Sequence, residues 1–157
     1  MRVNVSSNLI PVMKLSQISN LFVLTVLLAG CEPEPTAPVL TLDDGWVRAV
    51  PPGMTMTAAY GSFTNHGAEI IEITSFSSDS FTDVSLHETK LEDGVSTMKQ
   101  LPGLLLAAGS RTILQSGGLH LMLMNAEREI HPGDSIGLTL IAANGERYRF
   151  SLPVETR

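Results

Sequence analysis

A series of short segments with β-strand character constrains the fold of this chain more than any other feature. The segments are rich in Val, Ile, Thr, Tyr and Phe, and Gly, Asn, Asp and Pro interrupt them at regular intervals. No segment shows a helical period. We therefore predict an all-β domain, either a β-sandwich or a partly closed Greek-key barrel. The expected strands are Trp46–Val50, Ala58–Thr64, Glu69–Ser75, Val84–Thr89, Val95–Leu101, Arg111–Gln115, Leu119–Met124, Ser135–Ala142 and Arg147–Pro153.

Three turn sequences connect expected strands. A loop around Glu92 to Gly94 is predicted to join two strands as a hairpin. The stretch Asn65 to Gly67 and the pair Asn144-Gly145 are also typical of hairpin turns, and Asn-Gly is the pair that a type I′ turn prefers.

The N-terminal segment has the architecture of a secretory signal. An apolar run over residues 21–29 is short for a membrane span, and it follows Lys14. It ends in Leu-Ala-Gly before Cys31, which looks like the lipidation site of a bacterial lipoprotein. We expect a signal peptide over residues 1–30, a lipidated Cys31 with a Pro-rich tether over residues 31–41, and one β domain over residues 42–157.

Charge and cysteine content narrow the compartment and the partners. The chain has 10 basic and 16 acidic residues, a net charge of −6, and loss of Arg2 and Lys14 with the signal would make it −8. An acidic surface argues against nucleic acid as a partner. Cys31 is the single cysteine, so the expected domain has no thiol to oxidise in the cell envelope. Lipidation of Cys31 predicts attachment to a membrane by a lipid anchor.

Four side chains have the chemistry of a soft metal site. They are His87, Met98, His120 and Met122, in the pattern H-x10-M-x21-H-x-M. Neutral thioethers and imidazoles suit Cu(I) better than Zn²⁺, Mg²⁺ or Ca²⁺. We therefore predict Cu(I) as the bound ion.

Strand periodicity explains how these residues could meet. Alternation places Leu119, Leu121 and Leu123 on one face of a strand, and His120, Met122 and Met124 on the other. His87 and Met98 would face each other across the hairpin, within about one residue of register.

Other nearby residues have less specific roles. Met124 shares the face of His120 and is an alternative thioether, although packing explains it as well. Met54 and Met56, in a Pro- and Gly-containing loop, could add sulfur from above the site. Trp46 and Arg48 are interpreted as an aromatic residue at the core edge and a surface ion-pair partner.

The pattern and its context resemble the PCuAC family of periplasmic copper chaperones. This resemblance implies a cupredoxin-like fold, a monomer, and a non-catalytic carrier that delivers Cu(I) to an envelope protein for the CuA site of cytochrome c oxidase. The recipient could be oxidase subunit II or a Sco-like chaperone. The resemblance covers roughly residues 45–154 and includes Trp46-Val47-Arg48, Ala58-Ala59-Tyr60, Leu86-His87-Glu88-Thr89, Gly117 to Leu123 and Pro132-Gly133-Asp134.

Two other interpretations of the function remain open. The same ligands would serve a copper-buffering or resistance lipoprotein, and a β-sandwich without metal could use the Met and His residues for packing. An enzyme is not indicated, because no nucleophile elbow, phosphate loop or His-Glu-x-x-His motif occurs. Glu32 after the lipidated Cys31 slightly favours the outer membrane over the inner one by resemblance to enterobacterial sorting.

Overall fold

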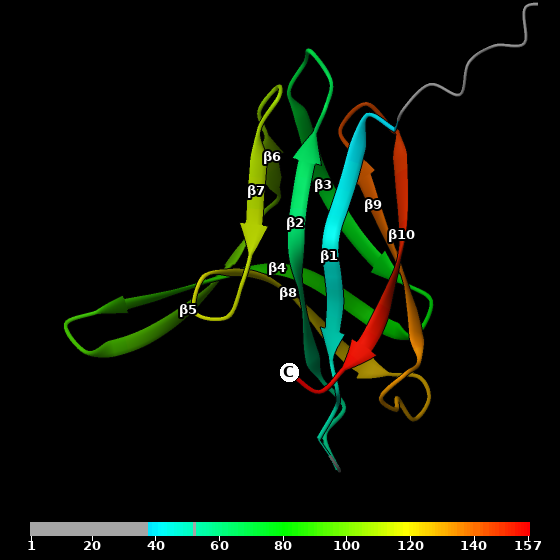
Figure 1. Ribbon diagram of the computed structural model, residues 1–157. Coiled ribbons are helices and arrows are strands. Elements are labelled where there is room, and N and C mark those ends of the chain that lie inside the picture. Colours follow the sequence, from blue (N-terminus) through cyan, green and yellow to red (C-terminus); the bar gives the residue numbers. More distant parts are fainter. Residues whose placement is uncertain (1–37, 52) are drawn as a thin grey trace, which may run out of the picture. The chain divides into compact units, whose positions relative to one another are not determined.

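The computed structural model describes residues 38–51 and 53–157, which form strands and connecting turns (Figure 1). The expected signal peptide, Cys31 and most of the tether lie outside the described residues. Within them, no helix is both long and apolar enough to cross a bilayer. The strands are β1 (Leu40–Arg48), β2 (Thr57–Asn65), β3 (Ile71–Ser78), β4 (Phe81–Glu92), β5 (Val95–Leu101), β6 (Leu104–Leu106), β7 (Arg111–Leu114), β8 (Leu119–Ala126), β9 (Ser135–Ala142) and β10 (Arg147–Glu155).

The strands form two layers that share one hydrogen-bonded path. The first layer has the order β5-β4-β8-β2-β1, with β7 also paired to β2, and the second has the order β10-β9-β3-β6. A parallel pairing of β1 with β10, at Val47 opposite Val154, joins the layers. The remaining pairings are antiparallel. The prediction of an all-β sandwich is confirmed.

The core lies between the two layers and is almost purely aliphatic. Leu121 and Leu123 of β8 and Ile136 and Leu140 of β9 have no exposed surface, and Phe63 of β2 is equally buried. Each of these residues alternates with more exposed neighbours along its strand, as expected when one face of a sheet packs on another. The opposite face of the first layer is therefore free to carry other chemistry.

Two strand predictions were incomplete. Strand β6 was missed, because three residues after Pro102-Gly103 give too short a pattern to recognise. Strand β1 begins at Leu40, earlier than the predicted Trp46. Its polar middle, Asp43-Asp44, hid the pattern, and the register shifts there between Asp43 and Trp46. Asp44 has a positive φ of 50°, which is typical of a bulge.

The turn predictions were partly wrong. Asn65 to Gly67 is not a hairpin, because β2 pairs with β1, β7 and β8 whereas β3 pairs with β6 and β9. Instead, the buried Asn65 side chain donates to the carbonyls of Glu69 and Leu106 and fixes a crossing between layers. Asn144-Gly145 does join β9 to β10, but only Gly145 has a positive φ, so the turn is not type I′.

The type I′ geometry occurs at Asp93-Gly94 instead. These two residues have φ values of 51° and 80°, and the flanking residues Glu92 and Val95 are paired. The hairpin of β4 and β5 was predicted here, and it is confirmed. Figure 1 shows that it projects away from the rest of the domain.

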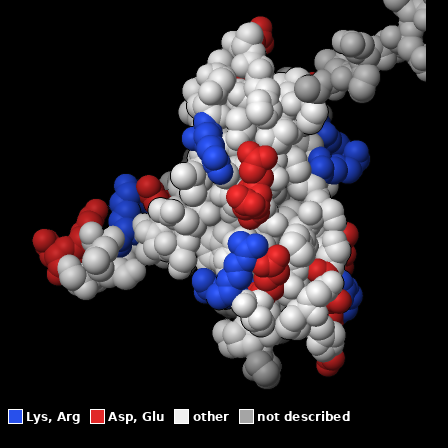
Figure 2. Space-filling model, in the orientation of Figure 1, with Lys and Arg blue, Asp and Glu red and all other residues white. Residues whose placement is uncertain are grey.

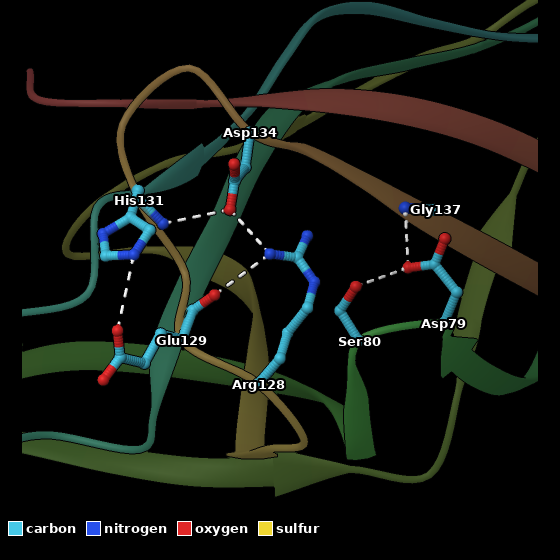
Figure 3. A network of polar contacts seen from close by, with 7 residues as sticks. All are labelled: Asp79, Ser80, Arg128, Glu129, His131, Asp134 and Gly137. Atoms are coloured by element: carbon cyan, nitrogen blue, oxygen red, sulfur yellow. Dashed lines mark hydrogen bonds and ion pairs between the residues drawn. The ribbon is translucent and has the colours of Figure 1, made fainter.

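A polar network fastens the loop between β8 and β9 (Figure 3). Arg128 donates to the Asp134 carboxylate at 2.7 Å, and the backbone N–H of His131 donates to the same carboxylate at 3.0 Å. The bond from the His131 backbone and then that from Arg128 lower the pKa of Asp134. Nearby, the Asp79 carboxylate accepts from the Gly137 N–H and from the Ser80 hydroxyl. The contacts of Asp134 therefore hold the loop between β8 and β9, and those of Asp79 hold the turn between β3 and β4 against β9.

Candidate metal centre

Two histidines lie side by side on the outer face of the first layer. His87 of β4 is directly opposite His120 of β8, and their ring centroids are 6.0 Å apart. His120 is only 3% exposed, and His87 is partly buried. Residues that are opposite each other in an antiparallel pair point to the same face. The strand pairing therefore brings together two imidazoles that are distant in the sequence.

Each imidazole has one nitrogen in a hydrogen bond and one without a partner. His120 Nδ1 is 3.0 Å from the Gly118 carbonyl, so it carries the proton in the neutral ring and leaves Nε2 with a free lone pair. His87 Nε2 is 3.0 Å from the Ser85 hydroxyl. His87 Nδ1 and His120 Nε2 are buried and have no hydrogen-bond partner among the described residues. Unpaired buried polar atoms are costly and rare, so this pair needs an explanation.

Burial also affects the protonation of His87. Desolvation lowers the pKa of His87 below its usual 6.5, and the nearby His120 adds to this effect, while Asp83 opposes it. The lowered pKa favours the neutral ring, which is the form that can bind a metal ion.

Met98 reaches this face from the neighbouring strand β5. Its backbone partner is Thr89, and the partner of His87 is Gln100, so Met98 and His87 are diagonal neighbours two residues apart in register. The predicted offset of about one residue was therefore wrong. An offset of two keeps both side chains on the same face, whereas an offset of one would have separated them.

Strand β5 is the outermost strand of its layer, and Met98 is 56% exposed there. Figure 2 shows charged side chains of both signs toward the end of the projecting hairpin. Met98 is therefore the most accessible of the four predicted ligands.

Met122 completes the group from the centre of the layer. It lies opposite Ser85 on one side and Ala58 on the other, on the same face as His120. The predicted alternation along β8 is observed, because Leu121 and Leu123 are fully buried on the inner face. A cavity of about 460 Å³ is lined by Met98, His120 and Met122 together. His87 is not among its lining residues and adjoins it through His120.

The three methionines considered as additional ligands occupy different positions relative to the cavity. Met54 and Met56 belong to the loop before β2, and both line the same cavity. Met124 lies opposite Asp83, one step further along β8, and is not among the lining residues. The sequence placed Met124 on the correct face but could not show how far the cavity extends.

The sequence did not predict that the Ser85 hydroxyl and the Gly118 carbonyl would bond to the two imidazoles. Ser85 could have been found, because it is two residues before His87 on the same face. The Gly118 carbonyl also accepts the backbone N–H of Thr89. This double use depends on the pairing of β4 with β8 and has no sequence signal.

An aromatic row continues the outer face beyond the histidines. The Tyr60 ring is 6.4 Å from His120 and 5.0 Å from Trp46, between centroids. The Arg48 guanidinium lies 5.2 Å from the Tyr60 centroid, a cation–π arrangement. Arg48 has no ion pair among the described residues. The interpretation of Arg48 as an ion-pair partner was therefore wrong.

Carboxylates do not gather around this face. Within residues 38–51 and 53–157, no group of three or more His, Cys, Asp or Glu side chains is close enough to hold a metal ion. A site here would have two imidazoles and would need thioether sulfur for its remaining ligands. That donor set suits a soft monovalent ion.

Comparisons with known proteins agree with this architecture. The solution structure of CuI-DR1885 from Deinococcus radiodurans is 31% identical, with a TM-score of 0.62 over 76% of this chain and 80% of that one. The copper-bound PCuAC domain from PmoF2 has a TM-score of 0.63 and 19% identity, over 76% of this chain and 95% of that domain, and supports the fold alone. The cupredoxin-like expectation agrees with these neighbours.

Sequence comparisons give one relative and one family, both of which carry the name of a putative lipoprotein. A protein of Leifsonia xyli subsp. xyli (strain CTCB07), named "Putative lipoprotein Lxx21020", is 33% identical over 111 residues, which are 70% of this chain and 66% of that protein. The model of the family described as "Putative lipoprotein LpqE-like" matches residues 40–154, nearly the whole described domain. The chain therefore belongs to the LpqE-like family.

Proposed function

We propose that this protein is a lipid-anchored carrier of Cu(I) in the bacterial cell envelope, with His87, Met98, His120 and Met122 as its ligands. The observation that carries the proposal is the pair of buried imidazole nitrogens without partners, beside a cavity lined by methionines. A bound cation would give both nitrogens a partner. The free-energy penalty of burying them unpaired in the metal-free protein would then be relieved when the ion binds.

The donor set supports copper in its reduced state. Two imidazoles and two thioethers provide soft, uncharged ligands, and the described part of the chain holds no carboxylate cluster that would compete for a hard ion. The likeness to CuI-DR1885, at 31% identity, agrees with this choice. Hydrogen bonds from His120 to Gly118 and between His87 and Ser85 would hold the rings in orientation.

The exposure of the ligands supports release by ligand exchange. Met98 is on an exposed edge strand, whereas His120 is almost completely buried. We infer that a partner's ligand first replaces Met98, shares the ion with the histidines, and takes it as the remaining contacts break. Met54 and Met56 are placed on the cavity and could hold the ion during this exchange. We expect Met124 to pack rather than bind.

The anchor and the recipient belong to the proposal as well. The name of the family and the sequence around Cys31 support a lipoprotein, which would hold the domain near a membrane. The resemblance to PCuAC chaperones favours a recipient that builds the CuA site of cytochrome c oxidase, with oxidase subunit II or a Sco-like chaperone as the direct acceptor. A copper-buffering lipoprotein would use the same site without a dedicated acceptor.

The direct test is a Cu(I) titration of the compact unit Ala37–Arg157, with X-ray absorption at the copper edge. We expect one Cu(I) per chain with mixed sulfur and nitrogen ligands. Met122→Ala should weaken binding by at least about tenfold, because it removes a thioether ligand. Met124→Ala is the matched control, because it removes the next methionine on the same strand face and should leave the affinity unchanged. Equal affinities of both variants and the unchanged protein would contradict the proposed ligands.

A transfer experiment separates a carrier from a buffer. The Cu(I)-loaded protein would be mixed anaerobically with an apo CuA domain, and samples would then be treated with ferricyanide, which removes one electron from the colourless dicopper(I) centre. The purple mixed-valence CuA centre formed in this way would be measured by absorption. Transfer faster than from a small-molecule Cu(I) complex of equal affinity supports the carrier. Transfer at the same rate supports the buffer.

A further inference from the structure

The cavity at the proposed copper site has an unusual charge. The residues that line it include three proposed ligands, Met98, His120 and Met122. The other described lining residues are uncharged, with one exception. That one is Arg48, a cation. A cavity proposed to bind a cation thus has a positive charge in its wall and no carboxylate among its lining residues, and the Asp83 carboxylate beside His87 lies outside that lining, opposite Met124.

Arg48 is held close to the histidines by the aromatic row. Its guanidinium lies 5.2 Å from the Tyr60 centroid, and the Tyr60 ring is 6.4 Å from the His120 ring. The guanidinium is therefore no farther from the imidazole than the sum of these two separations. Tyr60 is 6% exposed and cannot move aside easily, so the position of the charge is restricted.

A second arginine, Arg157, lies on the same aromatic row but differs from Arg48 in having an ion-pair partner. Arg157 lies 4.9 Å from the Trp46 centroid, and its side chain is paired with the Glu155 carboxylate. Its charge is largely neutralised. Arg48 has no such partner among the described residues, so its field acts on the cavity.

We propose that Arg48 makes the site discriminate between monovalent and divalent ions. This inference rests on the proposed function. A fixed positive charge repels a divalent ion twice as strongly as a monovalent one at the same position, because the Coulomb energy is proportional to the charge of the ion. Two imidazoles alone would also suit Cu(II) and Zn²⁺. Arg48 therefore raises the selectivity of the site for Cu(I) while lowering its absolute affinity.

The size of the effect follows from distance and screening. At about 10 Å and an effective dielectric constant of about 20, one unit charge changes a monovalent affinity by roughly tenfold. Because Arg48 is solvent-exposed, salt reduces this value at ionic strengths above about 0.1 M. The selectivity between the two ions should change by the same factor.

The experiment compares Arg48→Gln, Arg48→Lys and Arg157→Gln with the unchanged protein. Cu(I) affinity is measured anaerobically by competition with a chromogenic chelator, and Cu(II) affinity by competition with glycine. For Arg48→Gln we expect a tighter Cu(I) complex, by up to about tenfold, and a gain for Cu(II) that is the square of the gain for Cu(I). Arg48→Lys keeps the charge and should keep most of the selectivity. Arg157→Gln should change neither affinity.

The remaining outcomes would overturn either the inference about Arg48 or the proposed function. Unchanged selectivity in Arg48→Gln overturns the inference but leaves the copper site intact. Equal loss of selectivity in Arg48→Gln and Arg48→Lys assigns the effect to stacking on Tyr60, which also overturns it. Loss of Cu(I) binding in Arg48→Gln shows a structural role instead. No Cu(I) binding by the unchanged protein overturns the proposed function itself.

Discussion

The two faces of strand β8 have opposite properties although they share one backbone. On the inner face, Leu121 and Leu123 are completely buried between the layers and belong to the hydrophobic core cluster. On the outer face, His120 is almost equally buried, yet its Nε2 has no hydrogen-bond partner among the residues that the structure describes. Burial of the leucine side chains on the inner face stabilises the fold, whereas burial of the unpaired imidazole nitrogen on the outer face destabilises it. Equal burial can therefore serve stability or binding.

The largest expected effect is on the inner face. Leu121→Ala should lower the free energy of unfolding by about 2–5 kcal/mol, because it removes a fully buried side chain and leaves a cavity. Urea denaturation of the metal-free protein measures this change. The control Leu91→Ala, at a side chain that is 74% exposed, should change the same quantity by less than about 0.5 kcal/mol. Similar losses in both variants would remove the distinction between core and surface.

A smaller effect is expected on the outer face. His120→Leu removes an unpaired buried nitrogen together with one hydrogen bond, and Gly118 keeps its bond from Thr89. The free energy of unfolding of the metal-free protein should therefore change by about 1 kcal/mol or less. Thermal unfolding followed by circular dichroism is a sufficient measurement. A loss as large as that of Leu121→Ala would show that His120 is a structural residue.

The smallest effect concerns pH. Because the pKa of His87 is lower in the folded protein than its usual 6.5, the unfolded chain binds a proton more readily. The stability of the metal-free protein should then be complete above about pH 6.5 and decrease as the pH falls through the folded pKa. His87→Gln should flatten this dependence. Chemical denaturation between about pH 5 and 7 tests it, and an equal slope in both proteins would argue against the buried state of His87.

Much of the architecture could be predicted from local patterns. Alternation along β8 correctly separated Leu121 and Leu123 from His120 and Met122, because side chains of a strand point to opposite faces by geometry alone. The hairpin at Asp93-Gly94 was also predictable. Two of the failures have equally local causes. Strand β6 is too short to give a pattern, and the bulge at Asp44 interrupts that of β1.

The sequence by itself determined the donor types of the candidate site and the face that each one occupies on its own strand. Residue identity fixes donor chemistry, and the period of two fixes direction. Only the tertiary structure decided that His87 lies opposite His120, that Met98 is two residues out of register with His87, and that Arg48 faces the cavity across Tyr60. These relations depend on the pairing of strands that are distant in the chain. Strand order and register are set by the packing of the whole core, and no short pattern encodes them.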